Sequence, residues 1–142
     1  MTRRRSFFNF PFPLNGTAYA SLSVRYTDNS FFVKEDAMVK ELSADVFQGE
    51  VLSSEVPVLV DFWSPTCGPC RLLEPVLNEL ADEAAGRFQV KKINVWNEPE
   101  LATRFQISAV PTMLIFDQGR VVRTLIGYQD KSKLLRALQE AA

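Results

Sequence analysis

Hydrophobic and polar positions form two distinct patterns between residues 38 and 142. Residues 56–62 are almost continuously apolar (Val-Pro-Val-Leu-Val-Asp-Phe), as in a strand that is buried on both faces in the middle of a sheet. Further along, apolar residues recur every three or four positions, at Leu72, Leu73, Val76, Leu77, Leu80 and Ala84. This period predicts an amphipathic helix that runs to about Ala85 and stops at Gly86, with a kink at Pro75.

Shorter segments on either side complete the pattern. Ser43 is expected to cap a short helix over 44–48 that Gly49 ends, with a first strand just before it. The remaining predicted elements are a strand over 88–95, a helix over 98–105, a hairpin of strands over 112–116 and 121–126, and a helix over 131–141. This order predicts an α/β fold with a central mixed β-sheet flanked by helices on both faces.

Residues 1–37 follow neither period. Arginines at positions 3–5 precede an aromatic and proline-rich run over 7–13, and no acidic residue occurs before Asp28. Three interpretations are open: a disordered tail or an upstream start ahead of a natural start near Met38, an export or organelle signal, and a partner-binding arm. We therefore expect an extension over 1–37 and one domain over 38–142.

The overall composition argues against several classes of function. Sixteen Lys and Arg against seventeen Asp and Glu give a formal net charge of -1, so the chain has no net positive charge that would attract nucleic acid. No apolar stretch is long enough to span a membrane. The chain has no histidine, the commonest general base and metal ligand. We expect a soluble, cytoplasmic monomer that binds neither nucleic acid nor membrane, or an exported or organellar protein if residues 1–20 are a signal.

The two cysteines, Cys67 and Cys70, lie where the buried strand passes into the helix. Free N–H groups and the dipole at a helix N-terminus favour an anion, so the pKa of the Cys67 thiol should fall. Cys70 lies one turn further on, where it can attack a mixed disulfide on Cys67. Two alternatives remain open: a metal site shared between two chains, and an inert structural pair. An intrachain metal site would need two more soft ligands, and the chain has no other cysteine.

Several separated motifs, in this order, resemble the thioredoxin family. They are Val-Asp-Phe-Trp at 60–63, Cys-Gly-Pro-Cys at 67–70, Pro75 and Val-Pro-Thr at 110–112. The resemblance covers residues 38–142 and implies the thioredoxin fold, with Cys67 as the attacking thiol and Cys70 as the resolving thiol. It also implies an electron carrier that reduces protein disulfides and is restored by a thioredoxin reductase. No organic cofactor and no metal are implied, because the electrons reside on the sulfurs.

The resemblance assigns roles to residues around the cysteines. It implies that Asp61 accepts the proton of Cys70 and that Lys92 tunes Asp61, whereas the residues alone also allow a strand-end carboxylate that reaches water. It implies a cis proline at Val110-Pro111 that faces the dithiol, whereas the residues alone favour an ordinary trans proline. The other expected substrate-binding residues are Trp63, which is otherwise a plain core aromatic, Thr66, Gly68, Pro69 and Gly127.

Three positions depart from the family's pattern. The usual tryptophan before the first cysteine is Thr66, the acidic or polar position after the third strand is Trp96, and the usual lysine after the second cysteine is Arg71. We expect these changes to affect partner choice and redox potential while leaving the two-thiol mechanism intact. The expected function is protein-disulfide reduction. The alternatives are a disulfide oxidase or isomerase in an oxidising compartment, and a binding module in which redox activity is incidental.

Overall fold

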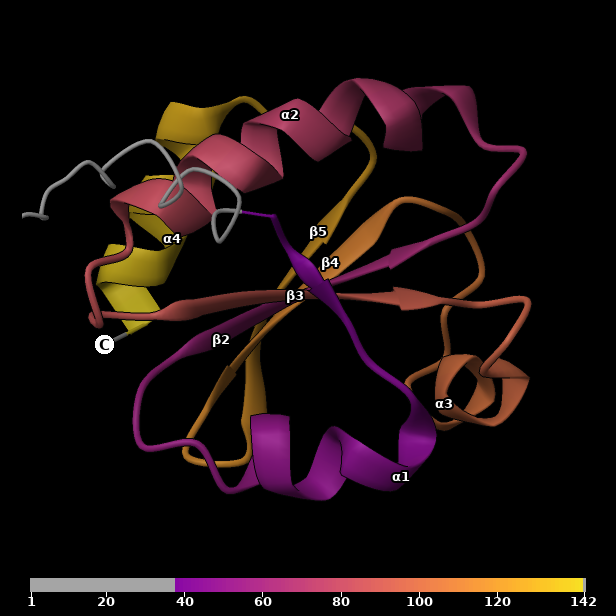
Figure 1. Ribbon diagram of the computed structural model, residues 1–142, viewed down its shortest axis with the longest axis horizontal. Helices are drawn as coiled ribbons and strands as arrows, with labels where there is room; N and C mark the ends of the chain where they lie inside the picture. The colour runs from indigo at the N-terminus through magenta and orange to yellow at the C-terminus, as the bar shows by residue number, and fades with distance from the viewer. Residues whose placement is uncertain (1–37, 142) are drawn as a thin grey trace, which may run out of the picture. The chain divides into compact units, whose positions relative to one another are not determined.

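The computed structural model describes residues 38–141 of the protein (Figure 1). The three interpretations of residues 1–37 therefore lie outside the described residues. In chain order the elements are β1 (Lys40–Glu41), α1 (Ala44–Phe47), the π-helical turn η3 (Gln48–Leu52), β2 (Val58–Trp63), α2 (Gly68–Glu83), β3 (Gln89–Asn94), α3 (Pro99–Arg104), β4 (Thr112–Asp117), β5 (Arg120–Ile126) and α4 (Lys131–Ala141).

Within the described part of the chain, the strands form one sheet in the order β1-β3-β2-β4-β5. Strand β3 runs parallel to both β1 and β2, whereas β4 runs antiparallel to β2 and to β5. Strand β2 lies in the middle, and its first five residues are all buried, as the continuous apolar run predicts. The predicted central mixed sheet is thus confirmed, as is the hairpin formed by β4 and β5.

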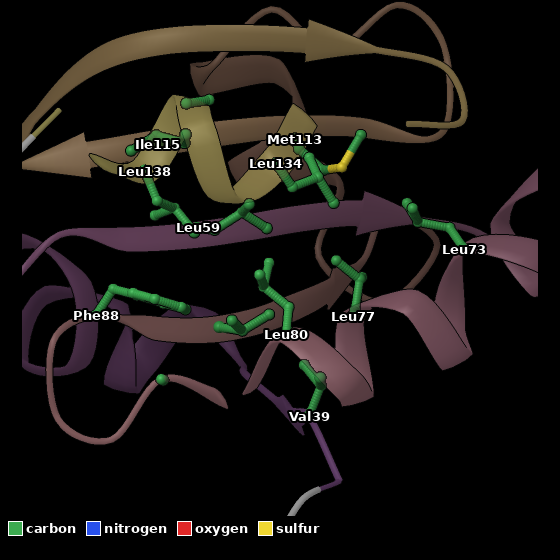
Figure 2. Close-up of a cluster of buried hydrophobic side chains, with 13 residues drawn as sticks. Val39, Leu59, Leu73, Leu77, Leu80, Phe88, Met113, Ile115, Leu134 and Leu138 are labelled. Atoms are coloured by element: carbon green, nitrogen blue, oxygen red, sulfur yellow. The ribbon is translucent and has the colours of Figure 1, made fainter. Parts of the chain in front are cut away.

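Helices α2 and α4 cover one face of the sheet (Figure 1). Figure 2 shows the core of this layer, where Leu59, Met113 and Ile115 of the sheet meet Leu73, Leu77 and Leu80 of α2 and Leu134 and Leu138 of α4. Burying one such side chain contributes about 1.5 to 3 kcal/mol. This layer therefore fixes α2, the helix that begins at the cysteine pair, against the central strand.

Helices α1 and α3, with the turn η3, cover the opposite face (Figure 1). Aromatic side chains dominate this second layer. The ring centroids of Phe105 and Phe116 lie 5.3 Å apart in an edge-to-face arrangement, and those of Phe47 and Phe116 lie 5.7 Å apart, which are favourable geometries for aromatic pairs. Helices on both faces of a mixed sheet confirm the predicted fold class.

The first helix is longer than the sequence predicts. The prediction that Gly49 ends it is wrong, because the chain continues through η3, where Ser53 N–H donates to the carbonyl of Gln48. The continuation buries Val51 against the second core layer, and this burial outweighs the weak helical preference of glycine. Ser43 does occupy the N-cap position, but its hydroxyl bonds the carboxylate of Asp45 and no helix N–H.

Two details of α2 also differ from the prediction. Leu72 is 67% exposed, so its assignment to the apolar stripe is wrong. The adjacent Leu73 is fully buried, and consecutive helix residues point about 100° apart, so both cannot face the core. The helix ends at Glu83, two residues before the predicted end, because Ala85 and Gly86 adopt left-handed backbone with φ of 49° and 80°.

Candidate active site

The junction between β2 and α2 positions the two cysteines. Cys67 is the N-cap of α2, and its N–H donates to the carbonyl of Ser64 at 3.2 Å. Cys70 lies in the first turn, and its N–H donates to Cys67 Sγ at 3.1 Å. The two residues are joined by a disulfide, with their Cα atoms 5.3 Å apart. The end of β2 and the start of α2 thus hold both sulfurs together beyond the C-terminal end of the central strand.

Cys67 is the more exposed residue of the pair. Cys67 is 9% exposed and Cys70 is 4% exposed. When the disulfide is opened, the Cys67 thiolate remains beside the N-terminus of a 16-residue helix, where N–H groups stabilise negative charge. The Arg71 guanidinium donates to the carbonyl of Pro65 at 3.0 Å and so connects the first turn of α2 to the loop before it.

The loop before β4 faces this disulfide. The Val110-Pro111 peptide bond is cis, as the resemblance implies and the residues alone do not. Cys67 Sγ lies 3.6 Å from the carbonyl oxygen of Val110. Gly127 N–H donates to the carbonyl of Pro111 at 2.8 Å, and a side chain at Gly127 would meet no atom within 4 Å. The structure therefore brings Cys67, Val110, Pro111 and Gly127 together at one surface.

A cavity of about 130 Å³ lies behind the disulfide. Its lining residues come from β2, β3, α2 and the segments beside them: Val39, Asp61, Trp63, Ser64, Pro65, Cys70, Arg71, Glu74, Leu77 and Lys92. Cys70 therefore lines the same cavity as an acidic side chain from β2, Asp61, and a basic side chain from β3, Lys92.

Asp61 is the buried acid of this cavity. It is 3% exposed and sits within β2, so it is not a strand-end carboxylate that reaches bulk water. Among residues 38–141, no group donates a hydrogen bond to its Oδ1 atom. Burial raises the pKa of Asp61 from 3.8 to about 7, while Lys92 acts to lower this pKa and Glu74 acts to raise it. Asp61 can therefore exchange a proton near neutral pH.

Lys92 lies beside Asp61 on the neighbouring strand, because the β2–β3 register pairs the two residues. Its ammonium is 2.9 Å from Glu74 Oε2 and 5.2 Å from the centroid of the Trp63 ring. Trp63 is half-buried and lines the cavity next to Cys70. Glu74 was not among the residues predicted for the site. Its spacing could have indicated it, because Glu74 follows Cys70 by one helical turn on the same side of α2.

Thr66 and Trp96, which depart from the family's pattern, are exposed. Thr66 precedes Cys67 in the chain, and Gly68 and Pro69, which follow Cys67, are exposed too. Trp96 is 59% exposed in the loop after β3, where its backbone N–H donates to Asn94 Oδ1 at 2.9 Å. A groove of about 350 Å³ begins beside it and is lined by Val95, Pro99, Ala102, Thr103, Ile107, Ser108, Ala109 and Val110. Val95, the residue before Trp96, thus lines the same groove as Val110.

A helix-capping disulfide that faces a cis proline and is backed by a buried carboxylate is a centre for thiol–disulfide exchange. The comparisons agree with this class. The family model for thioredoxin matches residues 38–140. The chain is 40% identical over 100 residues to thioredoxin 1 of Nostoc sp., covering 70% of this chain and 94% of that protein.

Two further relatives extend this match. M-type chloroplastic thioredoxin of Spinacia oleracea is 40% identical over 134 residues, covering 91% of this chain and 74% of that protein. The bifunctional thioredoxin reductase/thioredoxin of Mycobacterium leprae is 39% identical over 121 residues, which is 85% of this chain but 23% of that protein's length. The chain belongs to the thioredoxin family, and it is a thiol–disulfide oxidoreductase of the dithiol reductase type.

Proposed function

We propose that the protein carries electrons to disulfide bonds of other proteins, with Cys67 as the nucleophile and Cys70 as the resolving thiol. The observation that carries this assignment is the difference between the two sulfurs. Cys67 Sγ is at the N-cap of α2 and beside the Val110 carbonyl, whereas Cys70 lines the internal cavity. We therefore assign the attack on the substrate to Cys67, the more exposed cysteine of the two.

The reaction proceeds in two exchanges. The Cys67 thiolate attacks a substrate disulfide, so that one sulfur–sulfur bond forms to Cys67 while the second substrate sulfur leaves as a thiolate and is protonated. The Cys70 thiolate then attacks Cys67 Sγ, which restores the Cys67–Cys70 disulfide and releases the other substrate sulfur as a thiolate. Two electrons pass from the protein's dithiol to the substrate's disulfide.

Asp61 accepts the proton that the Cys70 thiol must lose before the second exchange. Both groups line the same cavity, and burial raises the pKa of Asp61 to about 7. A base whose pKa lies near the working pH is efficient in proton transfer. Lys92 tunes this group, because its positive charge lowers the pKa of Asp61.

The surface around Cys67 is the proposed binding site for the substrate peptide. The Val110 carbonyl oxygen lies 3.6 Å from Cys67 Sγ, and a Cβ atom at Gly127 would meet no atom within 4 Å. Thr66, Gly68 and Pro69 flank Cys67 in the chain and are exposed. An extended peptide can pair with the backbone at Val110, as a strand does at a sheet edge. Trp63 supports this surface from the cavity side.

Trapping the covalent intermediate tests the two cysteine roles. The protein is incubated with insulin as the disulfide substrate, and adducts are resolved by non-reducing electrophoresis and mass spectrometry. We expect Cys70→Ser to accumulate a mixed disulfide through Cys67, because the second exchange is blocked. Cys67→Ser should form no such adduct and should lose turnover. An adduct through Cys70 in the Cys67→Ser variant, at the rate seen in Cys70→Ser, would contradict the assignment.

The proposed source of electrons is a thioredoxin reductase, and the protein is proposed to act as a monomer. The relative in Mycobacterium leprae is named as both reductase and thioredoxin, which supports such a pairing. Neither nucleic acid nor a membrane is part of the proposal. Consumption of NADPH in a mixture of the protein, a bacterial thioredoxin reductase and insulin tests the pairing. A mixture that oxidises no NADPH above the level without the protein would contradict it.

We propose a cytoplasmic location, with an exported or organellar one as the alternative if residues 1–20 are a signal. Between residues 38 and 141, no helix is both long and apolar enough to cross a membrane. The spinach chloroplastic relative matches 91% of the chain, more than the family domain at 38–140 spans, and this supports the organellar alternative. Fluorescence imaging of the chain with and without residues 1–37 distinguishes the two locations.

A further inference from the structure

The ammonium of Lys92 is held by two side chains other than Asp61. Its Nζ atom is 2.9 Å from Glu74 Oε2, and it lies over the Trp63 ring at 5.2 Å from the centroid. Within the described part of the chain, Glu74 is the carboxylate that forms a salt bridge with Lys92. Lys92, the basic residue paired with Asp61 in the β2–β3 register, is therefore bound to a different acidic residue, Glu74 of α2.

The charged groups around Asp61 come from two elements. Lys92 extends from β3, and Arg71 and Glu74 extend from the first turns of α2. Arg71 is directed to the carbonyl of Pro65, which leaves Lys92 as the partner of Glu74. The residue paired with Asp61 from β4 is the uncharged Met113. The balance of charge at Asp61 thus depends on where the Lys92 ammonium is held.

The side chains differ in how freely they can move. Lys92 is 17% exposed and Glu74 is 47% exposed at the side-chain level. Both side chains line the cavity, and water partly screens the more exposed Glu74 carboxylate. Removing the Glu74 charge would leave Lys92 in place and free its ammonium to turn towards Asp61.

We propose that Glu74 is a positioning residue that acts through Lys92, holding the ammonium away from Asp61 so that Asp61 remains able to take the proton of the Cys70 thiol. This inference rests on the proposed function of Asp61 and extends it to a third side chain. The proton moves from Cys70 Sγ to the Asp61 carboxylate, and no other bond changes in that step. Glu74 itself touches neither the substrate nor the reacting sulfurs.

Two effects of Glu74 on Asp61 have the same sign. The direct repulsion between the two carboxylates raises the pKa of Asp61. The restraint on Lys92 does the same, because it keeps a positive charge from approaching Asp61 more closely. The Glu74→Gln substitution should therefore lower the pKa of Asp61. In the oxidised protein, we expect the midpoint of its titration to move about half a pH unit or more to lower pH.

The experiment is a titration of the Asp61 carboxyl carbon by ¹³C NMR in the oxidised full-length protein, where the disulfide removes both thiols from the titration. Wild type is compared with Glu74→Gln and with Glu79→Gln as the matched control. Glu79 stands on the same helix but pairs with Lys131, away from the cavity. The control should leave the Asp61 midpoint unchanged. An Asp61 midpoint that stays the same or rises in Glu74→Gln overturns the proposal.

A double variant separates action through Lys92 from direct repulsion. In a Lys92→Gln background, Glu74 has no ammonium to hold, so the shift caused by Glu74→Gln should fall to less than half of its size in wild type. An equal shift in both backgrounds shows that Glu74 acts on Asp61 directly and overturns the proposal. Thermal unfolding of each variant confirms that the proteins compared are folded.

A kinetic readout links the titration to the reaction. With insulin as substrate, the acidic limb of the pH–rate profile should move to lower pH in Glu74→Gln by the same amount as the NMR midpoint. An acidic limb that does not move while the midpoint does overturns the link to proton transfer. If the wild type fails to reduce insulin at all, the proposed function fails, and the NMR titration still reports on Glu74 and Lys92 independently.

Discussion

At the scale of single residues, the least ordinary feature is a carboxyl group in the middle of an apolar strand. Asp61 is 3% exposed, and burying an ionised carboxylate is costly because it loses water. Burial raises the pKa of Asp61 to about 7, so the carboxyl group is neutral in mildly acidic solution and avoids this cost. As the pH rises the group ionises, and the folded protein becomes less stable.

This behaviour predicts a pH-dependent stability that an asparagine would abolish. In the window between 3.8 and about 7, folded Asp61 holds a proton that unfolded Asp61 has lost, so the free energy of unfolding falls as the pH rises. From pH 5 to pH 8, wild type should lose about 2.5 kcal/mol more than Asp61→Asn. Urea unfolding of the two oxidised proteins at both pH values measures this difference. Parallel losses in both proteins would contradict the buried, raised-pKa carboxyl.

At the scale of elements, the turn between β4 and β5 shows how backbone geometry and packing act together. Gly119 has a φ of 79°, and the preceding Gln118 has a φ of 53°, as required in tight hairpin turns. A side chain at Gly119 would also approach the carbonyl oxygen of Leu52 to 3.0 Å. The hairpin turn is therefore packed against the end of η3, and glycine is needed there for two reasons.

Substituting two glycines tests this packing. Gly119→Ala should lower the free energy of unfolding by about 1 to 2 kcal/mol, because of its left-handed backbone and the approach to Leu52. Gly49→Ala is the matched control: it lies in η3, lacks a positive φ, and its side chain would meet no atom within 4 Å. It should be neutral or stabilising by up to about 1 kcal/mol. Equal losses in urea unfolding would refute the explanation.

The elements also show what the sequence could predict. Strand β2, the β4–β5 hairpin and α4 were predictable, because an apolar period or a turn signal is contained within each segment. The continuation of α1 through η3 was not, since it depends on Val51 packing in the second core layer. The exposure of Leu72 was not predictable either, because two adjacent leucines fit the same period and only the direction of α2 over the sheet decides between them.

The features of the active site also divide into those that the sequence could predict and those that it could not. Cys67 and Cys70 follow from their position before a helix, but the cis form of the Val110-Pro111 bond came from the family resemblance and not from the residues. The contact of Glu74 with Lys92 joins residues 18 positions apart on different elements. A local sequence pattern cannot predict such a contact, because the contact depends on how α2 packs across β3.

At the scale of the whole molecule, the fold places a reactive bond between a rigid support and an open surface. The layer of α2 and α4 packs α2 against the sheet, the cavity holds Asp61, the proposed proton acceptor, and the Val110 carbonyl oxygen lies 3.6 Å from Cys67 Sγ. The same arrangement can reduce or oxidise a substrate, since its direction depends on the stability of its own disulfide. The central claim, that the protein is a reductase, therefore rests on one thermodynamic quantity.

That quantity is the reduction potential of the Cys67–Cys70 pair. The purified full-length protein is equilibrated in graded glutathione buffers at pH 7, and its free thiols are trapped with an alkylating mass tag. We predict a single two-electron transition at a potential below that of the glutathione couple, so that the reduced protein donates electrons. A transition well above that couple, or no two-electron transition at all, would contradict the assignment as a protein-disulfide reductase.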